Sequence, residues 1–125
     1  MKLEDQVCSL ELAKKLKELG VKQESLFYWW FVRNDMGDDV FVSDTKPVNG
    51  TEYWSAFTVA ELGEMLPVRI NGGRRKYRID GLPVWFCNYA HKSNNHMHSI
   101  SADTEADARA AMLVYLLENN LITNP

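Results

Sequence analysis

Cys87, His91, His96 and His98 form the densest group of side chains that could bind a metal ion or supply a nucleophile. Thiolate and imidazole are ligands that zinc prefers, and a thiol beside an imidazole can attack an electrophilic carbon. The spacing C-x3-H-x4-H-x-H matches no regular zinc pattern, and no third group that would orient an imidazole stands out. A metal- or thiol-dependent enzyme is therefore one interpretation, a polar hairpin tip with ordinary imidazoles is the other, and we expect no cofactor.

A second group with chemical potential is a run of cations from Arg69 to Arg78 that contains no acidic residue. The turn sequence Asn71-Gly72-Gly73 predicts a hairpin here, with strands at Val68–Ile70 and Lys76–Ile79. Guanidinium groups beside Tyr77 can grip phosphates and stack on bases, which supports nucleic-acid binding. The same charges also suit a solvated edge hairpin that resists aggregation. The cations are Arg69, Arg74, Arg75, Lys76 and Arg78.

Aromatic residues dominate the run from Leu26 to Val32, which predicts a strand. Both alternating sets of this strand are apolar, so we expect both faces to be covered, by helices or by a partner. Large aromatics that a core cannot accommodate often lie at interfaces. Tyr28, Trp30 and Trp54 are therefore candidate interface residues, and protein binding, self-association included, is the first functional interpretation.

The acidic residues after this strand, Asp35, Asp38, Asp39 and Asp44, lack the spacing and distal glutamate of a calcium loop, and we interpret them as a solvated turn. The chain also lacks a phosphate-binding glycine loop, a nucleophilic serine elbow and an HExxH motif. These absences argue against the common enzyme classes and favour a non-enzymatic protein.

Three helices are predicted to position these residues. The first has Ser9 as its N-cap and Gly20 as its left-handed stop. The second begins with the capping box Thr58-Val59-Ala60-Glu61 and ends before Pro67. The third runs from Thr104 to Asn119, and Asn119-Asn120 can supply its stop.

Strands are predicted at Val40–Val42, Val84–Tyr89 and His96–Ser101 in addition to those above, and the segment Ser43–Ser55 is predicted to be a loop. The order is α-β-β-α-β-β-β-β-α. It predicts a single α+β domain over residues 1–125, with a largely antiparallel sheet and about three helices.

The third helix has an apolar stripe that should face the core. We expect Leu113 and Leu117 to be almost fully buried, and Glu105, Arg109 and Glu118 to face water. Thr104 and Asp107 also fit a second capping box. The stripe consists of Ala106, Ala110, Leu113, Val114 and Leu117.

The composition is that of an average globular protein, with 125 residues, 46% hydrophobic and 25% charged. The net charge of −3 argues against a chain that binds nucleic acid by overall charge. The acidic N-terminus does not resemble a signal peptide, and no apolar run approaches the roughly 20 residues of a membrane span. Cys8 and Cys87 are too few for a disulfide framework, so we expect reduced thiols, a cytoplasmic location and no membrane partner.

The order of elements from Thr58 to Asn120 resembles that of a double-stranded-RNA-binding domain. That family grips phosphates with lysines at the start of its last helix. This chain instead has Asp103, Thr104, Glu105 and Asp107 there, which would repel phosphate. The resemblance is therefore one of topology alone.

Three segments carry a second resemblance: Ser9–Trp29, Phe57–Pro67 and Thr104–Asn119. Their sequences, SLELAKKLKELGVKQESLFYW, FTVAELGEMLP and TEADARAAMLVYLLEN, are similar to those of a family of small uncharacterised proteins of bacterial prophages and plasmids. The resemblance implies a bacterial protein of a mobile genetic element. It implies no catalytic residues, because that family provides none to transfer.

Overall fold

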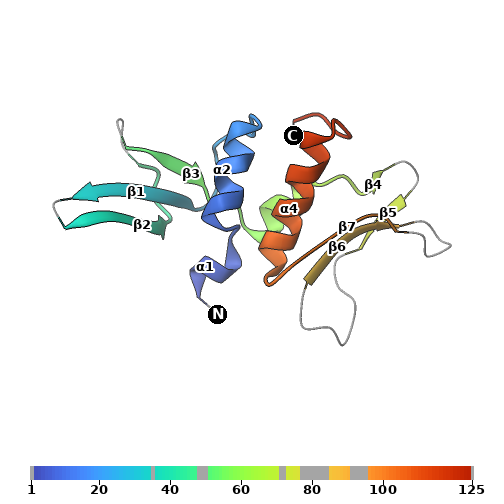
Figure 1. Ribbon diagram of the computed structural model, residues 1–125, viewed down its shortest axis with the longest axis horizontal. Helices are drawn as coiled ribbons and strands as arrows, with labels where there is room; N and C mark the ends of the chain where they lie inside the picture. Colours follow the sequence, from blue (N-terminus) through green and yellow to red (C-terminus); the bar gives the residue numbers. More distant parts are fainter. Residues whose placement is uncertain are drawn as a thin grey trace.

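The computed structural model describes residues 2–34, 36–47, 51–70, 73–76, 85–90 and 96–124. Within these ranges the chain forms four helices and seven strands (Figure 1). The predicted α+β class and antiparallel pairing are confirmed. The elements in chain order are α1 (Leu3–Gln6), α2 (Leu10–Glu18), β1 (Tyr28–Asn34), β2 (Gly37–Ser43), β3 (Tyr53–Ser55), α3 (Val59–Met65), β4 (Arg69–Ile70), β5 (Gly73–Lys76), β6 (Trp85–Ala90), β7 (His96–Ala102) and α4 (Glu105–Glu118).

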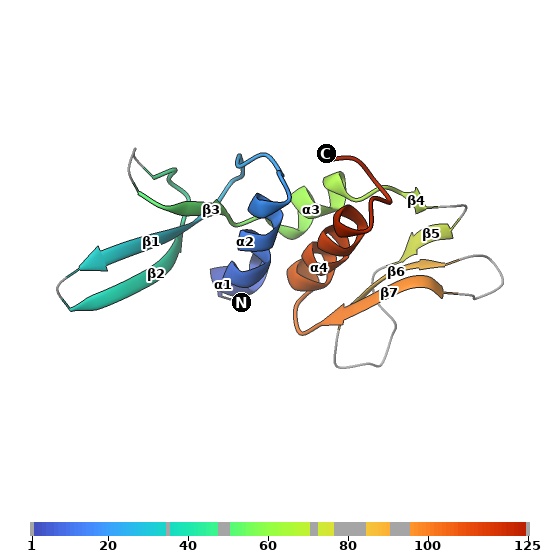
Figure 2. The ribbon, with the colours of Figure 1, turned by 45° about the horizontal axis from the view of Figure 1, so that its top comes forward.

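The strands form two sheets, ordered β2-β1-β3 and β4-β5-β6-β7, and the helices lie between them (Figures 1 and 2). Two elements were not predicted. Helix α1 is a single turn whose N-cap, Lys2, makes no side-chain hydrogen bond, so it has no start signal. Strand β3 lies inside the predicted loop Ser43–Ser55 and is only three residues long. No helix in the described ranges is long and apolar enough to span a bilayer.

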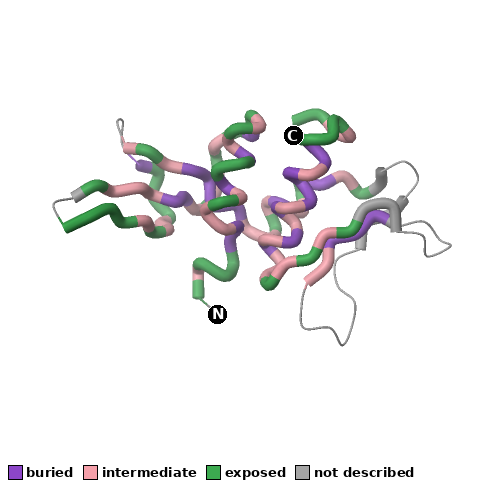
Figure 3. The backbone as a smooth tube through the Cα atoms, in the orientation of Figure 1, coloured by how far each residue is buried: buried purple, intermediate pink, exposed green. Residues whose placement is uncertain are grey.

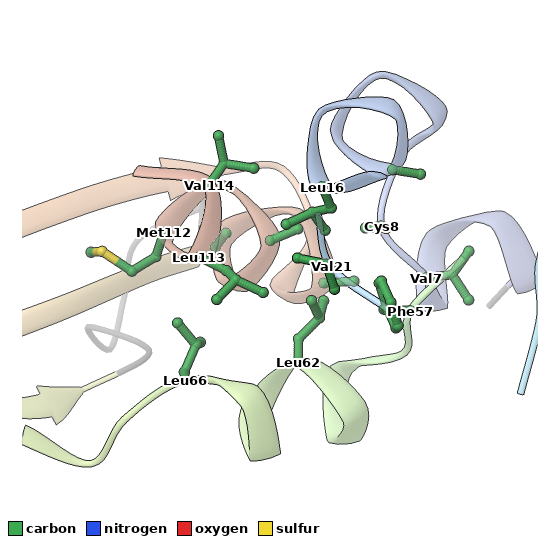
Figure 4. Close-up of a cluster of buried hydrophobic side chains, with 14 of the residues drawn as sticks. Val7, Cys8, Leu16, Val21, Phe57, Leu62, Leu66, Met112, Leu113 and Val114 are labelled. Carbon is green, nitrogen blue, oxygen red and sulfur yellow. The ribbon is translucent and has the colours of Figure 1, made fainter. Parts of the chain in front are cut away.

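Helix α4 lies at the centre of the molecule. It packs against β6 and β7 on one side and against α2 and α3 on another. Leu113 and Leu117 are buried and Glu118 is exposed, as predicted. In Figure 4, Leu113 points toward Leu62 of α3, and Leu16 of α2 lies beside them.

The predicted stripe on α4 is too narrow, because Ala108, Met112 and Leu116 are also buried. For the same reason the prediction that Arg109 faces water is wrong: its side chain is only 12% exposed. Its guanidinium donates to the Val59 carbonyl at 2.9 Å and to the Glu105 carboxylate at 2.8 Å. Glu105 is also partly buried rather than fully exposed.

The helix ends follow their local sequence signals. Gly20 has φ +88°, and the amides of Val21 and Gly20 donate to the carbonyls of Leu16 and Lys17, which is a Schellman ending. Helix α4 ends in the same way, with Asn120 at φ 55° as the left-handed residue. The capping box of α3 is complete between Thr58 and Glu61.

The second predicted capping box is only half formed, because Asp107 bonds elsewhere. Thr104 Oγ1 accepts from the Asp107 amide at 3.1 Å. The Asp107 carboxylate, however, accepts from the backbone amide of Ser9 at 2.7 Å, at the start of α2. The Asp107 side chain therefore joins the N-terminal ends of α2 and α4 through a bond between residues 98 positions apart in the sequence. Burial raises the pKa of Asp107, partly offset by the hydrogen bonds from Ser9.

This pKa shift predicts a specific pH dependence of stability. Because the folded-state pKa lies above the ordinary value of 3.8, protonation favours the folded chain, and this contribution is lost as the pH rises through the raised pKa. Asp107→Asn removes the titration. We expect the free energy of unfolding of the wild type, minus that of the variant, to be larger at about pH 4 than at about pH 7 in urea titrations. Asp38→Asn on β2 is the exposed control, and an Asp107 difference that is independent of pH would contradict the assignment.

Candidate protein-binding surface

Strands β1 and β2 form a hairpin that extends away from the helices (Figures 1 and 2). They pair along their full length, from Tyr28 opposite Ser43 to Asn34 opposite Gly37. Gly37, which lies within the predicted turn, has φ +118°, a conformation that favours glycine. Strand β3 pairs only with Tyr28–Trp30, so the outer half of the hairpin is supported by two strands alone. We call these three strands the projecting sheet.

One face of the projecting sheet packs on the core and the other carries an aromatic cluster. Trp29 and Trp54 lie on the core face, where the Trp29 indole donates to the Cys8 carbonyl at 2.9 Å. On the opposite face the register places Trp30 beside both Phe41 and Tyr53. The Trp30 and Phe41 rings are stacked with centroids 5.5 Å apart. The helices of the chain do not cover this face completely, because Trp30 is partly exposed and Phe41 is 42% exposed; cover by a partner stays a prediction.

The three candidate interface residues differ in how far the chain covers them. Tyr28 is 6% exposed, and its hydroxyl accepts from the Ser25 amide. Trp54 is 7% exposed, with the ammonium groups of Lys14 and Lys17 over its ring at 4.9 and 5.9 Å. Only Trp30 keeps a partly exposed ring, held in place by its indole N–H, which donates to the Thr45 carbonyl at 2.8 Å.

Phe41 belongs to this surface but was not selected from the sequence. The signal that could have found it is the strand register, because residues directly opposite each other project from the same face of a sheet. With Asn34 opposite Gly37, Phe41 must lie opposite Trp30. Figure 3 shows that the outer part of this hairpin is exposed or intermediate, whereas buried residues concentrate among the helices and the strands nearest to them.

The two edges of the projecting sheet differ in whether side chains bond their outward backbone groups. The outward backbone groups of β3 are bonded by side chains: Lys17 Nζ donates to the Tyr53 carbonyl and the Ser55 amide donates to Gln23 Oε1, both at 2.7 Å. The Ala56 amide donates to the Phe27 carbonyl and the Phe31 amide to the Glu52 carbonyl, so the odd-numbered residues of β1 direct their backbone groups toward β3. The even-numbered residues of β1 therefore direct their backbone N–H and C=O groups toward β2.

It follows that Asp38, Val40 and Val42 direct their backbone groups to the outer edge of β2. The Asp39 carboxylate accepts from the Val40 amide at 2.9 Å, which blocks one position of this edge. Asp38, Asp39 and Asp44 are all exposed, so the edge is acidic. Asp35 lies outside the described residues.

The predicted basic hairpin is present as backbone at the edge of the other sheet. Arg69 pairs with Arg74 and Ile70 with Gly73, so the second strand begins at Gly73 rather than at the predicted Lys76. Arg75 and Lys76 pair with Tyr89 and Asn88 of β6. Tyr77 and Arg78 lie outside the described residues. Contact of this hairpin with nucleic acid stays a prediction.

The Cys/His group is divided between two paired strands. Cys87 on β6 lies opposite Ile100 and is fully buried. His98 and His96 on β7 lie opposite Tyr89 and Ala90, and His91 is outside the described ranges. Among the described residues, no three His, Cys, Asp or Glu side chains are placed to hold a metal ion.

The other thiol, Cys8, is also fully buried, and burial raises its pKa to about 12. A thiol with that pKa is protonated at neutral pH and is a poor nucleophile. The described residues therefore provide no activated thiol at Cys8, and access to Cys87 requires opening of the core.

Comparison of the chain with protein-family models, with curated proteins and with solved structures gives no match. Its surfaces must therefore be interpreted from their own chemistry.

The burial of the two thiols leads to a direct prediction. We expect Cys8 and Cys87 of the native protein to react with a disulfide reagent at about pH 8 far more slowly than free cysteine, because both are 0% exposed. Both should react at once in guanidinium chloride, which serves as the control. Rapid modification of one thiol in the native chain would show an accessible, activated cysteine and would restore the thiol-dependent interpretation.

Proposed function

We propose that this chain is a non-enzymatic, protein-binding accessory protein of a bacterial mobile genetic element, a prophage or a plasmid, and that it acts in the cytoplasm. The mobile-element context rests on the three sequence segments described above. The binding function rests on the projecting sheet, and the observation that carries it is the Trp30–Phe41 stack on a face directed away from the core.

An aromatic pair in this position has the properties of an interface anchor. The Trp30 side chain is fixed by its bond to Thr45, and Phe41 is fixed against it, so a partner would not have to order them. Aromatic side chains are enriched at interface centres, and a few of them commonly supply most of the binding energy. The adjacent open edge of β2 adds backbone groups with which an extended segment can pair.

The charges beside this anchor favour a basic partner. Asp38, Asp39 and Asp44 lie along the β2 edge, where a strand carrying Lys or Arg would be complementary. A second copy of this chain is disfavoured, because antiparallel pairing of two β2 edges would place aspartates of both copies along one seam. The proposed partner is therefore a protein segment that is extended, basic and apolar on alternate positions.

A peptide titration tests this proposal. The probe is a fluorescent octapeptide of alternating lysine and valine, and the control peptide replaces lysine with glutamate. We expect anisotropy to show binding of the basic peptide alone, weakened by salt. Phe41→Thr should weaken binding about tenfold, since loss of one anchor ring costs more than about 1 kcal/mol. Thr keeps the preference for a strand.

The matched control is Val68→Thr, a similar change at another exposed apolar residue, and it should leave binding unchanged. Light scattering should give the mass of a monomer at high concentration. A dimer that Phe41→Thr dissociates would contradict the basic partner and establish self-association. Equal binding of both peptides, or no effect of Phe41→Thr, would overturn the projecting sheet as the binding surface.

A further inference from the structure

A cavity of about 610 Å³ lies beside the base of the projecting sheet, where α1, Phe27, the start of α3, the start of α4 and the first residue of β6 meet. Its size is within the range of pockets that bind small molecules. The residues that line it come from five separate parts of the chain, so it exists only in the folded protein. The lining residues used below are Asp5, Phe27, Val59, Trp85, Asp103 and Glu105.

One wall of the cavity is apolar and aromatic. Phe27, Val59 and Trp85 contribute to it, and each is packed against the hydrophobic core while remaining partly exposed. Such rings provide both apolar contact and a negative π-face that attracts a cation. The cavity can therefore hold an aromatic or aliphatic body with a charged group at its end.

The charged groups of the cavity are carboxylates. Glu105 is neutralised by Arg109, whose Nη2 lies 2.8 Å from its carboxylate. Asp5 and Asp103 are exposed, and neither is within salt-bridge distance of a described cation. Among the described residues that line the cavity there is no Lys or Arg. The local field is therefore negative and favours a cationic ligand.

The helix ends at this cavity do not reverse that preference. The N-terminus of α4 has its Asp107 amide bonded to Thr104, and that of α3 has its Glu61 amide bonded to Thr58. Glu105 and Glu61 in the two first turns also offset the positive ends of the helix dipoles. An anion would meet these carboxylates, whereas a cation would be attracted by them.

We infer that this cavity binds a small organic cation, an ammonium or guanidinium group on an apolar or aromatic body. The body would lie against Phe27 and Trp85, and the charged group would lie between Asp5 and Asp103. This site shares no residue with the projecting sheet, so the cation site can be absent while the proposed protein-binding surface stands.

Titration of the full chain followed by NMR tests the site, with phenethylammonium as the probe and 2-phenylethanol as its uncharged counterpart. We expect phenethylammonium to shift the amide resonances of Val59, Trp85 and Glu105, with an affinity about tenfold higher than that of 2-phenylethanol. Asp5→Asn combined with Asp103→Asn should weaken phenethylammonium binding about five- to tenfold, consistent with the loss of two partly screened charge interactions.

Glu118→Gln at the exposed end of α4 is the control for charge alone and should leave the titration unchanged. The amide spectrum of the double variant, compared with that of the wild type, shows whether it is folded; if it is not, Trp85→Leu provides a second variant, which should weaken phenethylammonium binding by removing the aromatic wall. Equal affinity for the charged and uncharged probes, an unaffected double variant, or shifts confined to other parts of the chain would each overturn the cation site.

Discussion

Helix α4 is held on several sides at once, by β6 and β7 of one sheet and by α1, α2 and α3. Its buried residues therefore lie around most of its circumference, from Ala106 and Ala108 in the first turns to Leu116 and Leu117 near its end. Helices α2 and α3 both pack against α4, and α4 packs against β6 and β7, so this helix connects them to the four-stranded sheet. The bond from the Ser9 amide to the Asp107 carboxylate fixes the relative position of α2 and α4.

This arrangement separates the residues that stabilise the fold from those that can bind a partner. Helix α2 with the start of β1, helix α3 and helix α4 contain the three segments Ser9–Trp29, Phe57–Pro67 and Thr104–Asn119, and the three helices pack together at the core (Figure 4). Phe41 and the open edge of β2 lie outside all three segments. These segments therefore form the supporting framework, whereas the proposed binding surface follows from the register of the β1–β2 hairpin.

Features determined by local chemistry could be predicted from the sequence. Ser9, Thr58, Gly20 and Asn120 mark helix ends because each solves a hydrogen-bonding or backbone problem within a few residues. Features that depend on residues far away in the sequence could not be predicted in this way. Strand β3 exists because it pairs with β1, and the Asp107 carboxylate leaves its own capping box because the Ser9 amide is close in space.

The exposure of individual side chains likewise depends on contacts between residues far apart in the sequence. Of the three candidate interface aromatics, only Trp30 stays partly exposed. Tyr28 and Trp54 are buried and contact Ser25, Lys14 and Lys17, which no local sequence pattern reveals. Arg109 was expected in water because charge is a good guide to exposure on a one-sided helix. This expectation is wrong on α4, because the polar side of this helix is also partly covered. The Arg109 guanidinium there donates hydrogen bonds to the Val59 carbonyl and the Glu105 carboxylate.

The outer half of the β1–β2 hairpin, which two strands alone support, should be less stable than the core around α4. Native-state hydrogen exchange followed residue by residue tests it most directly. The account predicts that the amides of Met112, Leu113 and Leu116 exchange only through global unfolding. The amides of Asp39 and Phe41, which are directed toward β1, should exchange through local opening of the hairpin, at a much lower free energy and with little dependence on denaturant. Equal protection of both groups, lost together in one unfolding transition, would contradict the account.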